Sequence, residues 1–321
     1  MNAANPSEHL MQCMEVWGGN NIVDSGVVMA GLDAWVFSKP FGAADAGGDI
    51  YYVSSCATGR ITRLLVADVS GHGSHVSDIA TSLRALMRKH VNQIEQTRFV
   101  RSMNEQFAAM SKAGVFATAI VTTFFAPTHE LKLCNAGHPP PLLYRARTRS
   151  WSFLECGAKS QAEVANVPLG VIDLADYDQF DVLLKVGDLV LCYTDSLIES
   201  KDETGEMLGT AGLLRIAQSI AVDDPAQVVP RLLDTITRVA PGNLNEDDVT
   251  VLLFRPNGLA PRASLGQRLL SPLRVAAKLF SSEPVPWPEW NIKNLGGTMS
   301  LALSRWRSRV TSGSGDPSNA D

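Results

Sequence analysis

Four short motifs each place an aspartate beside an apolar segment or a turn. They are GGD ending at Asp49, VADVSGHG with Asp68, YTDS with Asp195 and NEDDVT with Asp247. A carboxylate at the end of a buried strand can point into a cleft while the strand itself stays covered. Mg²⁺ and Mn²⁺ prefer oxygen ligands, and two such ions about 3.5–4 Å apart can bind a phosphate and activate a water. Without a metal, clustered carboxylates repel one another. The four motifs therefore make a two-metal hydrolytic site the leading hypothesis.

Each motif taken singly has an ordinary structural alternative. An aspartate after two glycines commonly hydrogen-bonds its own backbone in a turn. The pair Asp247-Asp248 before a strand is also compatible with simple turn chemistry. Only the joint order and spacing of the motifs favour metal binding over these alternatives.

The elements that must position these aspartates are strands and helices in separate groups. Strand patterns dominate residues 30–70, 115–145 and 180–195, and a last apolar run covers 249–254. The segment 185–188 resembles a turn between two antiparallel strands. Apolar spacings of three and four predict helices over 79–90, 100–110, 213–220 and 229–239. The order of strands, two helices, strands, two helices and a final strand predicts an α+β fold with antiparallel sheet.

Composition excludes several classes of protein. The chain has 321 residues, 45 % of them hydrophobic, and a net charge of −5. It can bury a substantial core, and it has no overall basic field that would recruit nucleic acid. No apolar run is long enough for a membrane span, and residues 1–15 lack the pattern of a secretion signal. Five dispersed cysteines, odd in number and without C-x-x-C spacing, favour buried free thiols in a cytoplasmic protein.

The motifs, in their order, resemble the PPM-type metal-dependent serine/threonine phosphatases, in the bacterial SpoIIE-like branch. The resemblance covers about residues 47–254. Besides the aspartate motifs it includes FATA (residues 116–119), NAGHPPP (135–141), PLG (168–170), TDSLIE (194–199) and DDVT (247–250). An ordered set of this kind is highly specific, although each motif alone is weak.

The resemblance implies a four-layer α/β/β/α sandwich of two antiparallel sheets flanked by helices, with two divalent cations, Mn²⁺ or Mg²⁺, at one end. Asp68 would be the ligand shared by both ions, and the backbone carbonyl of Val69 would add an oxygen. Asp49, Asp195 and Asp247 would complete the ligand shells directly or through water, and all four aspartates would serve catalysis. Asp248, the neighbouring position of the paired motif, would lie just outside these shells.

The resemblance also implies direct attack of a metal-activated water on phosphoserine or phosphothreonine in a protein, without a phospho-enzyme. The absence of a cysteine nucleophile motif agrees with this chemistry. Relatives in this branch often act in partner-switching signalling and dephosphorylate small antagonists of anti-sigma factors. A phosphorylated protein of that kind is the expected partner. The alternative is a non-catalytic signalling module on the same fold, which binds a phosphoprotein or partner without turning it over.

Three positions depart from the family pattern. Ser196 follows Asp195 where the family usually has glycine, so we expect some strain in this loop. Tyr52 stands where many relatives have an acidic residue, and the first metal motif is not extended to it. Ser70 occupies the spacing at which the broader family has an acid histidine, so that role is not transferred to His72.

The charge distribution suggests three segments. Residues 259–321 hold eight lysines and arginines against four aspartates and glutamates, a net charge of +4, whereas residues 1–258 hold 20 basic and 29 acidic side chains, a net charge of −9. We expect an N-terminal segment over 1–30, a phosphatase domain over 31–258, and a basic, partly helical C-terminal extension over 259–321 with a disordered end. Packing on the body or docking onto a partner is favoured for this extension over membrane contact.

Overall fold

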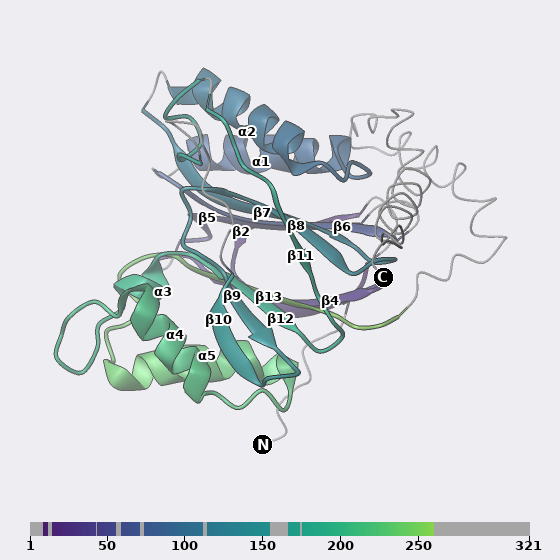
Figure 1. Cartoon of the computed structure of the whole chain (residues 1–321). Helices are drawn as coiled ribbons and strands as arrows, with labels where there is room; N and C mark the ends of the chain where they lie inside the picture. The colour runs from purple at the N-terminus through teal and green to yellow at the C-terminus, as the bar shows by residue number, and fades with distance from the viewer. Residues whose placement is uncertain are drawn as a thin grey trace, which may run out of the picture.

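The computed structural model describes residues 9–11, 15–42, 44–55, 59–70, 74–111, 114–154, 166–173 and 175–259. Within them, two β-sheets pack face to face and helices cover both outer faces (Figure 1). The expected four-layer α/β/β/α arrangement is confirmed. The basic extension, apart from Leu259, lies outside the described residues.

One sheet has six strands and carries the first two aspartate motifs. Its order is β11 (Phe180–Leu183), β8 (Glu130–Ala136), β7 (Ala117–Phe125), β6 (Ile61–Val69), β5 (Ala46–Ser55) and β2 (Val16–Asn21), with every pair antiparallel. Helices α1 (Ser74–Lys89) and α2 (Gln96–Ser111) cover its outer face.

The other sheet has seven strands, and the last two aspartate motifs lie at the ends of two of them. Its order is β1 (His9–Leu10), β3 (Val23–Met29), β4 (Leu32–Lys39), β13 (Val249–Pro256), β12 (Leu189–Tyr193), β9 (Leu142–Arg145) and β10 (Ser150–Phe153). Only the short β1–β3 pair is parallel among the described strands. The helices α3 (Ser196–Glu199), α4 (Gly209–Ser219) and α5 (Val228–Val239), with the 3₁₀ turn Pro225–Gln227, lie on its outer side.

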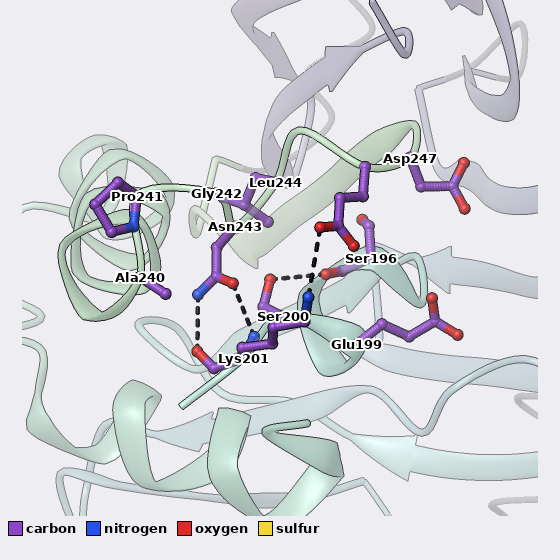
Figure 2. A pocket seen from close by; sticks show the side chains of 11 residues that line it. Ser196, Glu199, Ser200, Lys201, Ala240, Pro241, Gly242, Asn243, Leu244 and Asp247 are labelled. Carbon is purple, nitrogen blue, oxygen red and sulfur yellow. Dashed lines mark hydrogen bonds and ion pairs between the residues drawn. The ribbon is translucent and has the colours of Figure 1, made fainter. Parts of the chain in front are cut away.

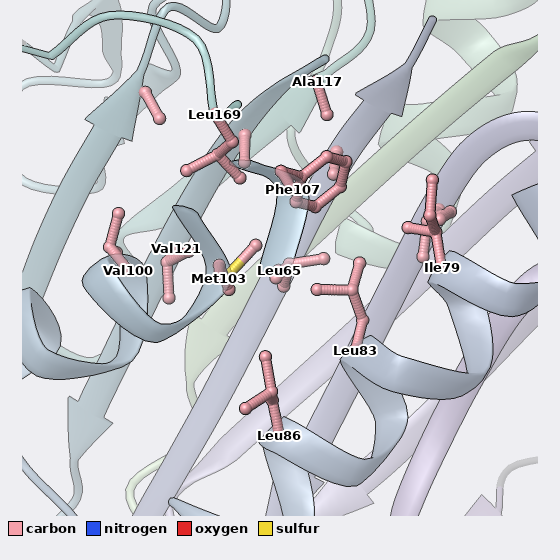
Figure 3. Close-up of a cluster of buried hydrophobic side chains, with 14 of the residues drawn as sticks. Leu65, Ile79, Leu83, Leu86, Val100, Met103, Phe107, Ala117, Val121 and Leu169 are labelled. Carbon is pink, nitrogen blue, oxygen red and sulfur yellow. The ribbon is translucent and has the colours of Figure 1, made fainter. Parts of the chain in front are cut away.

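Three layers of buried side chains hold the four layers together. The first lies between α1, α2 and the six-stranded sheet, where side chains such as Leu83 and Met103 pack on Leu65 (Figure 3). The second lies between the two sheets, and the third lies between the seven-stranded sheet and α4 and α5. Because successive side chains of a strand point to opposite faces, β6 supplies Leu65 and Ala67 to the first layer and Leu64 and Val66 to the second.

The expected helices are present as α1, α2, α4 and α5, each beginning up to five residues before the predicted range. Two expectations need correction. Strands β2 and β3 already belong to the two sheets, so the folded body includes residues assigned above to a separate N-terminal segment. The turn at 185–188 does not join a hairpin, because β11 before it pairs in the six-stranded sheet and β12 after it pairs in the seven-stranded sheet. The turn therefore carries the chain from one sheet to the other.

A fully buried arginine ties β6 to the connection between α1 and α2. The guanidinium of Arg63 donates to the backbone carbonyls of His90 and Gln93, both at 2.7 Å, and to Oγ1 of Thr123 at 3.1 Å. Its carbon lies 4.6 Å from the centroid of the Phe99 ring. Burial lowers the pKa of Arg63 to about 9. The charge is therefore offset by oriented dipoles and an aromatic face rather than by a carboxylate.

Two of the five cysteines, Cys134 and Cys192, are described, and both are buried and outside any disulfide bond, as expected. Burial raises the pKa of the Cys192 thiol to about 12, so it stays protonated at neutral pH. No helix among the described residues is long and apolar enough to cross a membrane.

Candidate active site

Two of the predicted aspartates lie directly opposite each other on neighbouring strands. Asp49 of β5 pairs with Asp68 of β6 in the antiparallel ladder, near the end of both strands. Asp68 has the same parity along β6 as Leu64 and Val66, and Asp49 has the same parity along β5 as Tyr51. Both carboxylates therefore lie on the face that is turned toward the other sheet, where the buried layer between the sheets gives way to polar side chains.

The other sheet contributes a buried threonine to this position. Thr194 follows the last residue of β12, is 0 % exposed, and donates from Oγ1 to Oδ2 of Asp49 at 2.8 Å. The same hydroxyl oxygen accepts the backbone amide of Thr250 at 3.0 Å. Thr194 thus links Asp49 of the six-stranded sheet to β13 of the seven-stranded sheet at the candidate site. Sequence reasoning did not single it out, although it is the residue immediately before Asp195.

Asp248 fastens the GGD motif to the loop before β13. Its carboxylate accepts the backbone amides of Phe41 at 2.6 Å and Asp49 at 3.3 Å, and also that of Gly48. A Cβ atom on Gly47 would lie 2.5 Å from this carboxylate. The first glycine of the motif therefore leaves room for Asp248 beside the strand. Asp248 positions Asp49 through the Asp49 backbone amide.

Asp195 is the N-cap residue of the short helix α3. Its backbone carbonyl accepts the amides of Ile198 at 2.8 Å and Glu199 at 2.9 Å. Ser196, the first residue of α3, has a helical conformation that any residue can adopt, so the expected strain from replacing glycine is not found. The side chain of Ser196 is instead buried.

The remaining predicted ligands lie close to this group. Asp247 is in the loop that leads into β13, where its carboxylate accepts the backbone amide of Asp248 at 2.7 Å. Val69 is the last residue of β6, next to Asp68. The segment 71–73 of the SGHG motif, including His72, lies outside the described residues.

The carboxylates are close enough to influence one another's protonation. Burial raises the pKa of Asp49 well above its ordinary value, and the charges of Asp68 and Asp248 raise it further, against a hydrogen bond from Thr194. Burial likewise raises the pKa of Asp68 to about 7, with added repulsion from Asp195 and from other neighbouring carboxylates. Burial and the charge of Asp247 raise the pKa of Asp195. The structure therefore gathers negative groups from both sheets where an adjacent cation would relieve their repulsion.

The donor set fits a hard divalent cation in its chemistry. All of its side chains offer carboxylate oxygens, the ligands that Mg²⁺ and Mn²⁺ prefer. No group of three or more His, Cys, Asp or Glu side chains in the described part of the chain is arranged to hold a single ion as it stands. The aspartates thus form an electrostatically coupled cluster of oxygen donors.

The NAGH segment forms a hydrogen-bonded turn beside the cluster. Asn135 accepts the backbone amide of His138 at 2.7 Å and donates to its carbonyl at 2.9 Å. The Nδ1 of His138 lies 2.9 Å from Oγ1 of Thr118, which is the residue opposite Asp68 on β7. Burial lowers the pKa of His138 to about 4, so the imidazole is neutral near pH 7. The turn is therefore bonded to β7, the strand next to the one that carries Asp68.

Known proteins resemble the chain in sequence and in fold. Phosphoserine phosphatase RsbU of Bacillus subtilis is 22 % identical over 225 residues, which cover 70 % of the chain and 63 % of RsbU. The chain thus spans less than two thirds of that relative. A structure of the RsbU and RsbW domains of a Mycobacterium tuberculosis protein superposes with a TM-score of 0.58 at 26 % identity, covering 81 % of the chain and 71 % of that structure.

A more distant structure, RsbX in complex with magnesium, has a TM-score of 0.52 at 14 % identity and covers 73 % of the chain and all of that structure. At this identity the likeness concerns the fold alone. The family model of stage II sporulation protein E matches residues 58–257, which is more than half of the sequence. The chain therefore belongs to the SpoIIE family.

Proposed function

We propose that the chain is a metal-dependent protein serine/threonine phosphatase that hydrolyses phosphoserine or phosphothreonine on a protein substrate. The observation that carries this proposal is the pair Asp49 and Asp68, held opposite each other at the edge of the inter-sheet core and coupled to Asp195, Asp247 and Asp248. A fold that only needed stability would gain nothing from burying these carboxylates side by side.

In this proposal Asp49, Asp68, Asp195 and Asp247, with the carbonyl of Val69, hold two divalent cations, Mn²⁺ or Mg²⁺. Bound cations would supply a water of lowered pKa as nucleophile and would neutralise charge on the phosphate. Asp68 takes the shared position, because its carboxylate is coupled to Asp49 of the same sheet and to Asp195 and Asp247 beside the other sheet.

The chain's other residues hold this group in place. Thr194 fixes one carboxylate oxygen of Asp49 from the opposite sheet, and Asp248 fixes the backbone of the same residue. Cys134 and Cys192 are buried, and the raised pKa of the Cys192 thiol keeps it protonated. Neither of these two thiols is therefore a suitable nucleophile, which supports direct attack by water rather than a phosphocysteine.

The substrate proposed is a phosphorylated protein of a partner-switching system, such as an antagonist of an anti-sigma factor, in the cytoplasm. The likeness to RsbU and to a structure that joins RsbU and RsbW domains supports this choice. We further propose that the folded phosphatase body ends near Gly258, after β13, and that residues 259–321 contribute to protein recognition rather than to hydrolysis.

The alternative is a non-catalytic module that binds a phosphoprotein without turning it over. The observation in its favour is that the described carboxylates do not form a ready chelate for one ion. The two functions differ in one measurement, the hydrolysis of an aryl phosphate in the presence and absence of Mn²⁺. A phosphatase releases phosphate only with the metal, whereas the binding module releases none under either condition.

The decisive variant is Asp68→Asn, which removes the charge of the carboxylate that both cations would share. We expect it to abolish turnover and to remove the Mn²⁺-dependent rise in melting temperature, while the metal-free protein stays folded. Asp195→Asn and Asp247→Asn should impair activity less and recover part of it at higher metal concentration. Asp181→Asn, on the edge strand β11, is the matched control and should behave like the wild type. An Asp68→Asn variant with a near-normal rate at saturating Mn²⁺ would remove Asp68 from the mechanism.

A further inference from the structure

A pocket of about 230 Å³ opens beside the candidate metal centre, between α3 and the loop that precedes β13 (Figure 2). Asp247, a proposed metal ligand, forms part of its wall. Ala240, Pro241 and Leu244 provide apolar surface on the side of the loop, and Glu199 lies at the end of α3. The pocket therefore combines apolar walls with a carboxylate, next to the place where a phosphate would be bound.

The pocket is preformed, because one buried asparagine joins its two sides. Asn243 is 6 % exposed and accepts the backbone amide of Lys201 at 2.8 Å. Its amide nitrogen donates to the carbonyls of Lys201 at 2.8 Å and Ile236 at 3.0 Å. These bonds fasten the loop to Lys201, shortly after α3, and to α5. The pocket therefore does not depend on a ligand for its shape.

A hydroxyl group in the wall of the pocket lacks a partner. Ser196 is 6 % exposed, lines the pocket, and its Oγ has no hydrogen bond among the described residues. A buried hydroxyl without a partner is costly, so a side-chain rotation that turns this oxygen toward the pocket would let a ligand supply a hydrogen bond that the free protein does not make.

The charged side chains around the pocket determine which sign of charge on the ligand is favoured. Glu199 is exposed and has no cationic partner in the described part of the chain, and its pKa is raised by burial and by the nearby carboxylates of Asp195 and Asp247. Glu246 has a partner, because Lys201 Nζ lies 3.5 Å from its Oε1. With Asp247 engaged by a metal, Glu199 remains as the unneutralised charge, so an anionic ligand is disfavoured and a cationic one is favoured.

We propose that this pocket binds a basic side chain, arginine or lysine, of the substrate protein close to the phosphorylated residue. The apolar walls would cover the methylene groups of that side chain, Glu199 would accept from its charged end, and Ser196 Oγ would complete the contacts. The proposal rests on the proposed phosphatase function and names a determinant of its substrate specificity.

The test uses the full chain with Mn²⁺ and a set of phosphoserine peptides on a neutral background. Each peptide carries one arginine at a different position within three residues of the phosphoserine, and its control carries the neutral isostere citrulline there. At the best position, arginine should raise kcat/KM about tenfold, the effect of one charge-assisted hydrogen bond. In Glu199→Gln this preference should fall to about twofold or less, and in Ser196→Ala it should fall in part. Glu203→Gln, an exposed glutamate outside the pocket, should keep the wild-type preference.

Each preference is the ratio of the kcat/KM values of two peptides measured on one enzyme preparation. A partial loss of active protein therefore cancels from the ratio. An arginine preference below twofold at every position in the wild-type chain would overturn the inference. A preference that persists unchanged in Glu199→Gln would overturn it as well. If aryl phosphate is hydrolysed in either case, the proposed function stands and only the pocket assignment fails. Absence of Mn²⁺-dependent hydrolysis of any substrate would overturn both.

Discussion

Replacing Thr194 with valine should weaken both the fold and the metal site, although the two side chains have the same shape. The change removes the hydroxyl that donates to Asp49 Oδ2 at 2.8 Å and accepts the Thr250 amide at 3.0 Å. A hydrogen bond to a charged group contributes about 1.5–3 kcal/mol, and a buried amide left without an acceptor costs about 1–3 kcal/mol. The raised pKa of Asp49 lets the metal-free protein protonate this carboxylate, which reduces the first loss. We therefore expect a loss of about 3 kcal/mol in unfolding free energy.

Two measurements follow from this magnitude. For a domain of this size, about 3 kcal/mol should lower the melting temperature by roughly 6–12 °C in metal-free buffer. Calorimetric titration with Mn²⁺ should show an affinity at least about tenfold weaker, because groups that orient a metal ligand typically contribute 10- to 100-fold. The reason is that Asp49 loses the side-chain donor Thr194, which reaches it from the opposite sheet.

Two further variants separate the hydroxyl from general effects of the substitution. Thr194→Ser keeps the hydroxyl and should retain most of the metal affinity. Thr237→Val, on α5, removes a hydroxyl that donates to the Leu233 carbonyl at 2.9 Å within the helix, and it should leave Mn²⁺ binding unchanged. A Thr194→Val protein that melts within about 1 °C of the wild type and binds Mn²⁺ equally well would refute the positioning role.

Four other changes test separate parts of the structure. Gly47→Ala places a methyl group 2.5 Å from an aspartate of the neighbouring loop and should lower both stability and Mn²⁺ affinity, whereas Gly242→Ala meets no atom within 4 Å and serves as its control in thermal melts. Arg63→Met removes the guanidinium hydrogen bonds to the buried carbonyls of His90 and Gln93 and to Oγ1 of Thr123, and it should cost about 3 kcal/mol in urea unfolding; unchanged stability would contradict this. Ser196→Gly should not raise aryl phosphatase activity, because Ser196 already has a helical backbone conformation and the change relieves no strain; a clear rise in activity would contradict this. Truncation after Gly258 should spare aryl phosphate turnover and change turnover of a protein substrate, a difference that should shrink at high salt; an insoluble product would place the extension within the core.

The aspartates could be singled out from the sequence because each lies beside an apolar segment or a turn and because the motifs occur in a specific order, although each motif alone is weak. Asp68 follows the apolar run of β6, and Asp195 follows that of β12, so each is marked as a polar residue at the end of a buried strand. The same alternation that buries Leu64 and Val66 places Asp68 on the inter-sheet face. The family pattern supplied the order of the motifs, and hence the expectation that they meet.

Residues with a role set by a distant partner left no such signal. Thr194 reads as one more β-branched residue in an apolar run, and its contact to Asp49 spans 145 positions. The connection from β11 to β12 looks like a hairpin turn because turn chemistry is local, whereas the choice of sheet depends on which strands are already paired. The pocket at Ser196 was likewise beyond sequence reasoning, since its opposite wall comes from residues 240–247.

The sequence by itself determined the alternating strands, the four main helices, the separation of an acidic body from a basic extension, and the identity of the aspartates. Periodicity, turn residues and charge are properties of short segments, so they can be read without knowing the fold. The tertiary structure alone decided that Asp49 faces Asp68, that Thr194 and Asp248 hold Asp49 from the other sheet, and that Ser196 lines a pocket rather than straining a loop. These facts depend on strand register and on how two sheets pack, and both are set by burial summed over the whole chain rather than by any local run of residues.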